Sequence, residues 1–124
     1  MIVADTSYIV EAILRDASLL EAETIITPDL TLYETVNTLW KHGTLIGDLK
    51  DPSLHVDLLL ELISAGAIQL VRPDEKLLKD TYALSAKHKV PVYDMVFVAL
   101  ALELSVELKT FDGKQADILS KERA

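Results

Sequence analysis

The chain has 124 residues and 50% of them are hydrophobic, which is enough for one domain with a core of its own. It contains no cysteine, which excludes disulfides, thiolate catalysis and cysteine-ligated zinc, and which fits a reducing, cytoplasmic compartment. Its net charge of −8 at pH 7 argues against tight non-specific binding to nucleic acid through a basic surface.

Strand-like and helix-like segments alternate along the chain. The predicted strands are residues 1–4, 24–27, 67–71 and 106–110. The predicted helices follow Asp5 and Gly113 and also cover residues 29–42, 52–64, 74–88 and 92–105. Continuous apolar strands that alternate with helices indicate an α/β fold with a parallel sheet covered on both faces. No linker or repeat divides the chain, so we expect a single domain over residues 1–124.

Neither a secretion signal nor a membrane span is expected. The opening residues 1–10 carry no basic leader and include an aspartate at position 5. The uncharged apolar run Met95–Leu102 is less than half of the roughly 20 residues that a membrane span needs. We therefore expect a soluble protein without a membrane partner.

The predicted helix over residues 29–42 has an apolar stripe that we expect to face the core, and Gly43 is expected to end it. The stripe consists of Leu32, Tyr33, Val36, Leu39 and Trp40. Glu34 falls on the opposite face with Lys41, and spacing alone predicts that it faces solvent.

Two aspartates follow predicted strands, where open α/β sheets bind their ligands. Asp5 follows the first predicted strand and Asp112 follows the fourth. Asp5 could also simply cap the next helix, and Asp112 with Gly113 could simply form a turn. The sequence leaves both interpretations open for each residue.

Asp94 is a stronger candidate. It is the only charged residue between Lys89 and Glu103, at the start of a helix that is apolar on nearly every side. An ionised carboxylate in such a place is costly unless it is hydrogen-bonded, paired or bound to a metal. Capping of the helix N-terminus is the alternative explanation.

Four segments, taken together, resemble the PIN-domain nucleases, and especially the VapC-like toxins of prokaryotic toxin–antitoxin pairs. The segments are MIVADTSYIV, ITPDLTLYETVNTLWK, VPVYDMVFVALALEL and ELKTFDGK, which together span essentially the whole chain. In that family each segment contributes an acidic residue to a metal site. The matching residues here are Asp5, Glu34, Asp94 and Asp112. The family also has hydroxyl residues beside the site, which match Thr6 or Ser7 and Thr110.

The resemblance implies a three-layer PIN-like domain whose parallel sheet has about four strands in the order 3-2-1-4. It implies a divalent-metal-dependent endoribonuclease that uses Mg²⁺ or Mn²⁺ and a metal-activated water to hydrolyse RNA. An antitoxin partner and a homodimer are further implications. Family members commonly add a terminal strand, which we do not expect after the last helix here; its absence should affect stability more than the metal site.

Phosphate contacts and rival functions complete the hypothesis. The cations that could meet a phosphate are Arg15, Lys41 and Lys114. The histidines lack ligand-like spacing and are expected at the surface.

The alternative function is a catalytically inactive PIN-like module that binds RNA or a protein, because a fold alone does not settle function. A phosphatase of the haloacid-dehalogenase type fits poorly, since Ser7 stands where it needs a second aspartate.

Overall fold

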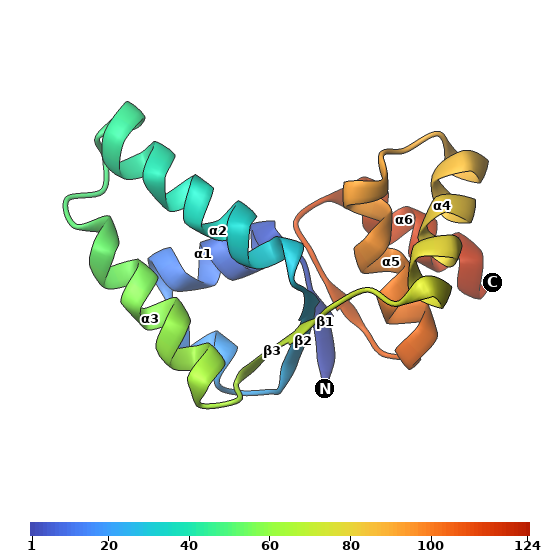
Figure 1. The fold of residues 1–124 in the computed structure, drawn as a ribbon, viewed down its shortest axis with the longest axis horizontal. Helices are drawn as coiled ribbons and strands as arrows, with labels where there is room; N and C mark the ends of the chain where they lie inside the picture. The colour runs from blue at the N-terminus through green and yellow to red at the C-terminus, as the bar shows by residue number, and fades with distance from the viewer.

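A four-stranded parallel sheet lies between two groups of helices in the computed structural model, which describes all residues from 1 to 124 (Figure 1). The strands are β1 (Ile2–Ala4), β2 (Ile25–Pro28), β3 (Ile68–Val71) and β4 (Leu108–Lys109). Their order is β3-β2-β1-β4 and each neighbouring pair is parallel. The α/β fold class and the strand order 3-2-1-4 are therefore confirmed.

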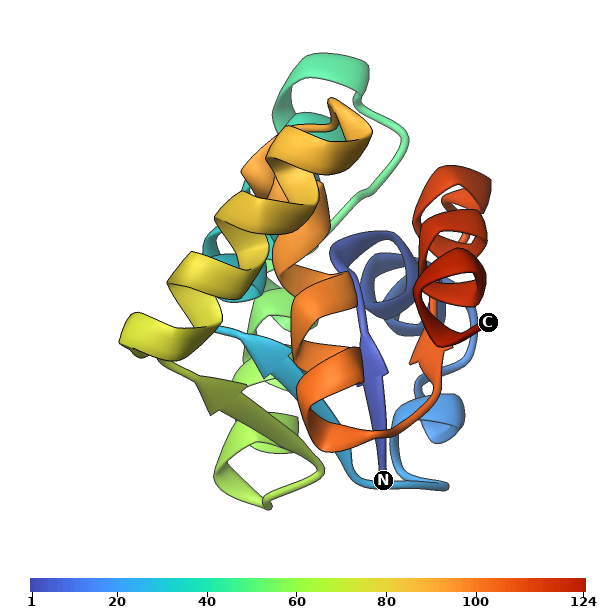
Figure 2. The ribbon, with the colours of Figure 1, turned by 90° about the vertical axis from the view of Figure 1, so that its right-hand side faces the viewer.

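Six α-helices cover the two faces of the sheet. They are α1 (Thr6–Arg15), α2 (Leu30–Trp40), α3 (Pro52–Ser64), α4 (Glu75–His88), α5 (Val92–Leu104) and α6 (Gly113–Arg123). Helices α1–α3 lie on one side, and α4–α6 lie on the other, with α5 running across the sheet between α4 and α6 (Figures 1 and 2). No helix is both long and apolar enough to span a bilayer.

Side chains of the strands alternate between the two faces and are apolar on both. Val3 and Ile26 pack with α4, α5 and α6, whereas Ile2 and Ile25 pack with α1 and α3. This two-sided burial is the reason why the strands are continuous apolar runs in the sequence. In α5 all residues from Met95 to Ala101 are buried, so this helix has no polar face along its middle.

Helix α2 is buried on a different side from the one that its apolar stripe predicts. Its buried residues are Thr31, Thr35 and Leu39. Three members of the predicted stripe are instead exposed: Tyr33 to 74%, Val36 to 36% and Trp40 to 49%. The expectation that the whole stripe faces the core was wrong for these three residues.

Hydrogen bonding explains how the first turn of α2 can bury the Thr31 hydroxyl, whereas the buried Thr35 hydroxyl has no partner. The Thr27 hydroxyl donates a hydrogen bond to the Ala4 carbonyl at 2.8 Å, and it lies 2.7 Å from the Thr31 hydroxyl. Buried hydroxyls that are hydrogen-bonded in this way avoid the cost of desolvation. These contacts join the start of α2 and the end of β2 to the last residue of β1.

The sequence suggested that Gly43 ends the helix, but the structure shows that it does not. A π-helical turn, η2 (Lys41–Ile46), continues α2 and ends at Gly47, whose φ of 77° lies in the left-handed region that favours glycine. A Cβ atom on Gly43 would lie only 2.5 Å from Cγ of Pro52. Gly43 therefore allows the first turn of α3 to approach η2 closely.

A short 3₁₀ helix, η1 (Ala17–Leu20), was also not predicted.

Candidate metal centre

The predicted acids come from four separate segments and lie at the carboxyl end of the parallel sheet. Asp5 and Asp112 follow β1 and β4, which are neighbouring strands. Asp94 lies in the first turn of α5, and Glu34 lies in α2. The strand order reverses between β1 and β4, because the chain crosses to the other face of the sheet after β3. This is the place where open α/β sheets bind their ligands.

Asp5 is buried, and hydrogen bonds hold both of its carboxylate oxygens. Oδ1 accepts hydrogen bonds from the Ser7 hydroxyl at 2.7 Å and from the Tyr8 backbone N–H at 3.0 Å. Oδ2 accepts one from the Thr110 hydroxyl at 2.6 Å. Asp5 therefore caps α1 and also contacts the end of β4, so the two interpretations of this residue are compatible.

Thr110 connects the aspartates of the two strands. Its hydroxyl donates to Asp5 and accepts a hydrogen bond from the Asp112 backbone N–H at 2.9 Å. Oδ1 of Asp112 in turn accepts from the Lys114 backbone N–H at 2.9 Å and caps α6. This chain of hydrogen bonds fixes how the turn after β4 sits beside β1.

Glu34 is half-buried and faces α1, in contrast to the solvent-facing position that spacing predicted. Its Oε1 atom accepts a hydrogen bond from the Thr6 hydroxyl at 2.7 Å. Because α2 buries its threonine side, the helix is rotated relative to the predicted orientation and Glu34 is directed toward the residue after Asp5. The correction strengthens Glu34 as a site residue.

Asp94 does not cap its helix, because the N-cap position belongs to Pro91 and has no side-chain hydrogen bond. Burial raises the pKa of the Asp94 carboxyl, and the negative charges of Asp112 and Asp5 raise it further. The positive charge of Lys114 and the side chain of Gln115 act in the opposite direction. Part of this rise in pKa comes from neighbouring negative charge, which a bound cation would relieve.

The chemistry of these donors fits a hard divalent cation, since Mg²⁺ and Mn²⁺ prefer oxygen ligands. However, no three acidic or histidine side chains lie close enough together to form a ready coordination group. Asp5 and Glu34 hold hydrogen bonds to hydroxyl groups instead. The structure thus brings the acids to one end of the sheet but not into the tight cluster that we expected. Mutual repulsion between carboxylates accounts for this separation.

Comparison with known proteins decides the family, because a family model described as PIN domain matches residues 2–119. The chain belongs to the PIN-domain family. A curated relative, Ribonuclease VapC3 from Pyrobaculum aerophilum, is 37% identical over 97 residues, which cover 78% of this chain and 72% of the relative. The resemblance to VapC-like PIN domains is therefore confirmed.

The three cations predicted for this PIN domain are placed differently relative to the acids. Lys114 lies near enough to Asp94 to lower the pKa of that carboxyl. Lys41 is exposed at the start of η2, about 10 Å along the helix from Glu34. Arg15 lies at the opposite end of α1 from Asp5 and pairs with Glu11, so the structure does not bring it to the site.

Two polar residues near the acids of this PIN domain were missed from the sequence. Gln115 is buried beside Asp94 and its Oε1 atom has no partner. Its spacing from Ile118 and Leu119, at i+3 and i+4, could have placed it on the buried face of α6. Thr27 donates a hydrogen bond to the Ala4 carbonyl at the end of β1. The sequence could not single it out as a site residue, because β-branched residues are common in strands.

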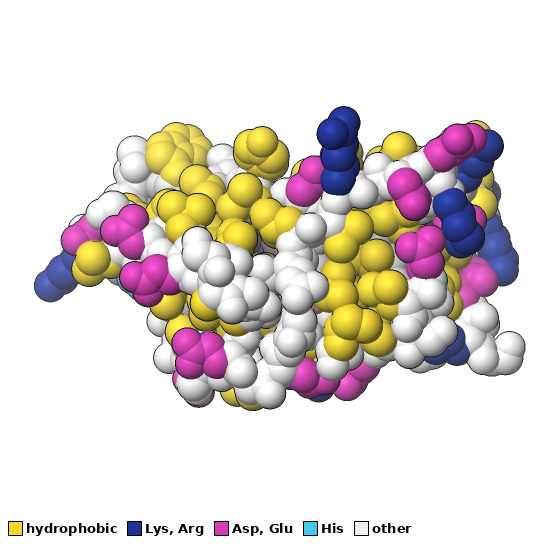
Figure 3. All heavy atoms as spheres, turned by 60° about the horizontal axis from the view of Figure 1, so that its bottom comes forward, with side chains coloured by type: hydrophobic (Ala, Val, Ile, Leu, Met, Phe, Trp, Pro, Cys, Tyr) yellow, Lys and Arg dark blue, Asp and Glu magenta, His cyan; other side chains and the backbone are white.

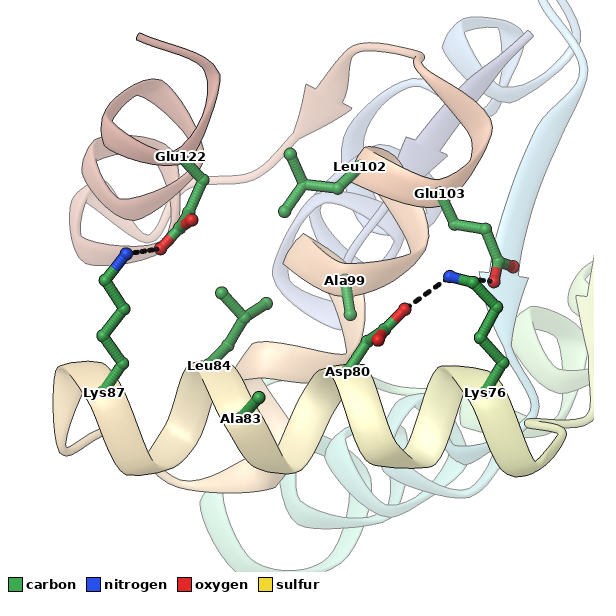
Figure 4. Close-up of a pocket in the computed structure, with 9 residues that line it drawn as sticks. All are labelled: Lys76, Asp80, Ala83, Leu84, Lys87, Ala99, Leu102, Glu103 and Glu122. Atoms are coloured by element: carbon green, nitrogen blue, oxygen red, sulfur yellow. Dashed lines mark hydrogen bonds and ion pairs between the residues drawn. The ribbon is translucent and has the colours of Figure 1, made fainter.

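A hollow of about 380 Å³ between α4, α5 and α6 contains none of the predicted acids (Figure 4). Its apolar lining residues are Ala83, Leu84, Ala99 and Leu102. Ion pairs flank this lining: Lys76 with Asp80 at 2.6 Å, and Lys87 with Glu122 at 2.9 Å. Because its charged groups already pair with each other, the hollow is not the candidate site.

His88 is not the surface residue that the sequence suggested. Its side chain is only 15% exposed, and Nε2 lies 2.7 Å from Oε1 of Glu122. Lys87 contacts the same oxygen. His88 therefore joins α4 to α6.

Proposed function

We propose that this PIN domain is a divalent-metal-dependent endoribonuclease of the VapC type. The observation that carries the proposal is the placement of Asp5, Asp94 and Asp112 at the carboxyl end of the sheet, where burial raises the pKa of Asp94 and the charges of Asp112 and Asp5 raise it further. Membership of the PIN family and the relative named Ribonuclease VapC3 support the reaction class.

The cation would be Mg²⁺ or Mn²⁺, with Asp5 and Asp94 as its main ligands. Glu34 and Asp112 would complete the set of ligands or orient water. A divalent ion, when bound, supplies a water of lowered pKa as the nucleophile and stabilises charge on the phosphoryl oxygens.

Hydroxyl groups around the acids would act as positioning residues. Ser7 and Thr110 hold the two oxygens of Asp5 from opposite sides, and Thr6 holds Glu34. Such contacts fix the direction in which a ligand presents its lone pairs, and their loss typically weakens metal binding or activity about 10- to 100-fold. Lys114, beside Asp94, is the cation best placed to meet a substrate phosphate.

A protein partner is part of the proposal, as the toxin of a VapBC-type pair would bind an antitoxin and form a homodimer. On the face shown in Figure 3, hydrophobic side chains are exposed over both halves of the molecule. The exposed apolar residues of α2 and η2 are Tyr33, Val36, Trp40, Leu45 and Ile46. Tyr33, Val36 and Trp40 are spaced at i, i+3 and i+7 and therefore share one side of α2, and a group of exposed apolar residues supports a partner surface.

The first experiment measures cleavage of a panel of single-stranded and structured RNAs in Mn²⁺, Mg²⁺ or EDTA. An Asp5→Asn/Asp94→Asn double variant tests the site. An Asp57→Asn/Asp117→Asn double variant is the matched control, because it makes the same change of charge at two exposed positions outside the site. We expect cleavage by the wild type and the control in Mn²⁺ or Mg²⁺, and none in EDTA or by the site variant.

The same experiment tests the alternative, a catalytically inactive module. That module would bind RNA or a protein partner but leave every RNA intact with each metal. Calorimetric titration with Mn²⁺ then adds a second readout. Binding of the ion by the wild type and not by the site variant supports the proposed metal centre, whereas no binding by either protein overturns it.

A further inference from the structure

Three aromatic residues that directly precede acids of the proposed site in the sequence are exposed instead of being buried in the core. The chain has four tyrosines, two phenylalanines and one tryptophan. Phe111 precedes Asp112, Tyr93 precedes Asp94 and Tyr33 precedes Glu34, and their exposed fractions are 66%, 62% and 74%. Burying such a ring would contribute about 1.5–3 kcal/mol to folding, so core packing does not explain these positions.

Phe111 is the most firmly placed of these rings. It stacks on Tyr8, with ring centroids 6.0 Å apart and planes inclined by 23°. The backbone N–H of Phe111 donates to the Ser7 hydroxyl at 3.2 Å, and the backbone N–H of Tyr8 donates to Asp5 at 3.0 Å. Both residues are thus fixed to the groups that surround Asp5, while most of the Phe111 ring stays open to solvent.

The charge of the protein limits how it could hold RNA. A net charge of −8 and one lysine beside the acids leave little scope for neutralising phosphates, which is the usual source of affinity. Stacking of a base on an aromatic ring does not depend on positive charge and contributes about 1–3 kcal/mol per base. An exposed, fixed ring next to an acidic site is suited to this mode of binding.

We propose that Phe111, supported by Tyr8, is a substrate-binding residue on which an unpaired nucleobase next to the scissile phosphate stacks. The inference rests on the proposed ribonuclease function and adds a base-binding subsite to it. Purines stack more strongly than pyrimidines, so the subsite gives a modest preference for a purine at one position. The competing explanation is that the ring only packs the β4–α6 turn against α1.

The test uses a short RNA that the wild type cleaves at one bond, together with versions that lack the base at single positions around that bond. The variants are Phe111→Ala, Phe111→Trp, and Tyr82→Ala as a control, because Tyr82 is an exposed ring on α4, which carries none of the four acids. Thermal unfolding of each variant shows whether its fold is retained.

We expect Phe111→Ala to lower kcat/KM on the intact RNA by about 5- to 100-fold, while Phe111→Trp and Tyr82→Ala stay close to the wild type. At one position, removal of the base should slow the wild type by a similar factor. On that RNA the wild type and Phe111→Ala should be equally active, because both changes remove the same contact.

A loss in Phe111→Ala that is equal on the intact RNA and on every base-free version would overturn the inference and assign the ring to packing. No loss in Phe111→Ala would overturn it as well. Both results require that the wild type cleaves RNA, so they leave the proposed function standing. If the wild type cleaves no RNA with any metal, the proposed function fails and the subsite fails with it.

Discussion

Helices α5 and α2 each carry one acid of the proposed site, but the two helices are buried in opposite ways. In α5 every residue from Met95 to Ala101 is buried, whereas α2 buries Thr31 and Thr35 and exposes most of its apolar stripe. Asp94 stands out in the sequence because the rest of its helix is apolar. Glu34 does not, because α2 has two faces that could each be buried. Hydrophobic pattern locates a site residue reliably only where the helix has no solvent-facing side.

The largest expected effect is the loss of activity when the acid of each helix, Asp94 or Glu34, is replaced. Replacing a main ligand, Asp94→Asn, should lower kcat/KM about 1,000-fold, since several kcal/mol of transition-state stabilisation depend on the cation. Glu34→Gln should cost about 10- to 100-fold, because the amide oxygen can still accept the hydrogen bond from Thr6. RNA cleavage in Mn²⁺ measures both. Equal losses would contradict the ranking of Asp94 above Glu34.

Substitutions in the two helices should also differ clearly in their effect on the free energy of unfolding. Leu100→Ala in α5 should lower the free energy of unfolding by about 2–5 kcal/mol, because it leaves a cavity in the core. Tyr33→Ala on the exposed side of α2 should change it by about 0.5 kcal/mol or less. Urea unfolding at several protein concentrations measures both values. A large, concentration-dependent loss in Tyr33→Ala would show that a second copy covers this side of α2.

A smaller effect is expected from the hydroxyl that directs Glu34. Thr6→Val removes the donor to Glu34 Oε1 and should lower kcat/KM about 10-fold. In a Glu34→Ala background the same change should have little further effect, because the acceptor of the hydrogen bond from Thr6 is already absent. Thr81→Val is the control, as the Thr81 hydroxyl is buried in α4 and bonds only the Leu77 carbonyl. Additive losses would mean that Thr6 acts on something other than Glu34.

The smallest effect concerns the helices that cover α5. Hydrogen bonds from Lys87 and His88 lower the pKa of the Glu122 carboxyl. At pH values above the ordinary pKa range of glutamate, a lowered pKa of Glu122 stabilises the folded protein. This stabilisation is lost as the pH falls through the lowered pKa. At pH 7, Glu122→Gln should therefore lower stability by about 1 kcal/mol or less, and the difference from the wild type should shrink as the pH falls below the ordinary pKa range of glutamate. A difference that persists unchanged at acid pH would contradict the ion-pair explanation.

Much of the fold could be predicted from local pattern. The strands around Val3, Ile26 and Ile68 are apolar on both sides because both sides of the sheet are covered, and this pattern is unambiguous. The predicted ranges 52–64 and 74–88 agree with α3 and α4 to within one residue, because the left-handed Gly66 and the Asp74 cap are local signals that depend on adjacent residues only. The strand order came from the resemblance to a family and not from these patterns.

The features that could not be predicted depend on contacts between distant segments. The role of Gly43 depends on Pro52, which approaches only once α2 and α3 have packed together. The burial of His88 depends on Glu122, which is 34 residues away. The orientation of α2 depends on a hydroxyl contact between Thr27 and Thr31, which no periodicity of hydrophobic residues reveals.

The hydrogen bond between Thr110 and Asp5 joins residues that are 105 positions apart. While the chain is being synthesised, Asp5 therefore lacks this partner until β4 has left the ribosome. Asp112 becomes available at the same stage, and only then can the acids of the first and last strands meet. The proposed metal site is therefore completed only near the end of synthesis, when most of the messenger RNA has already been translated.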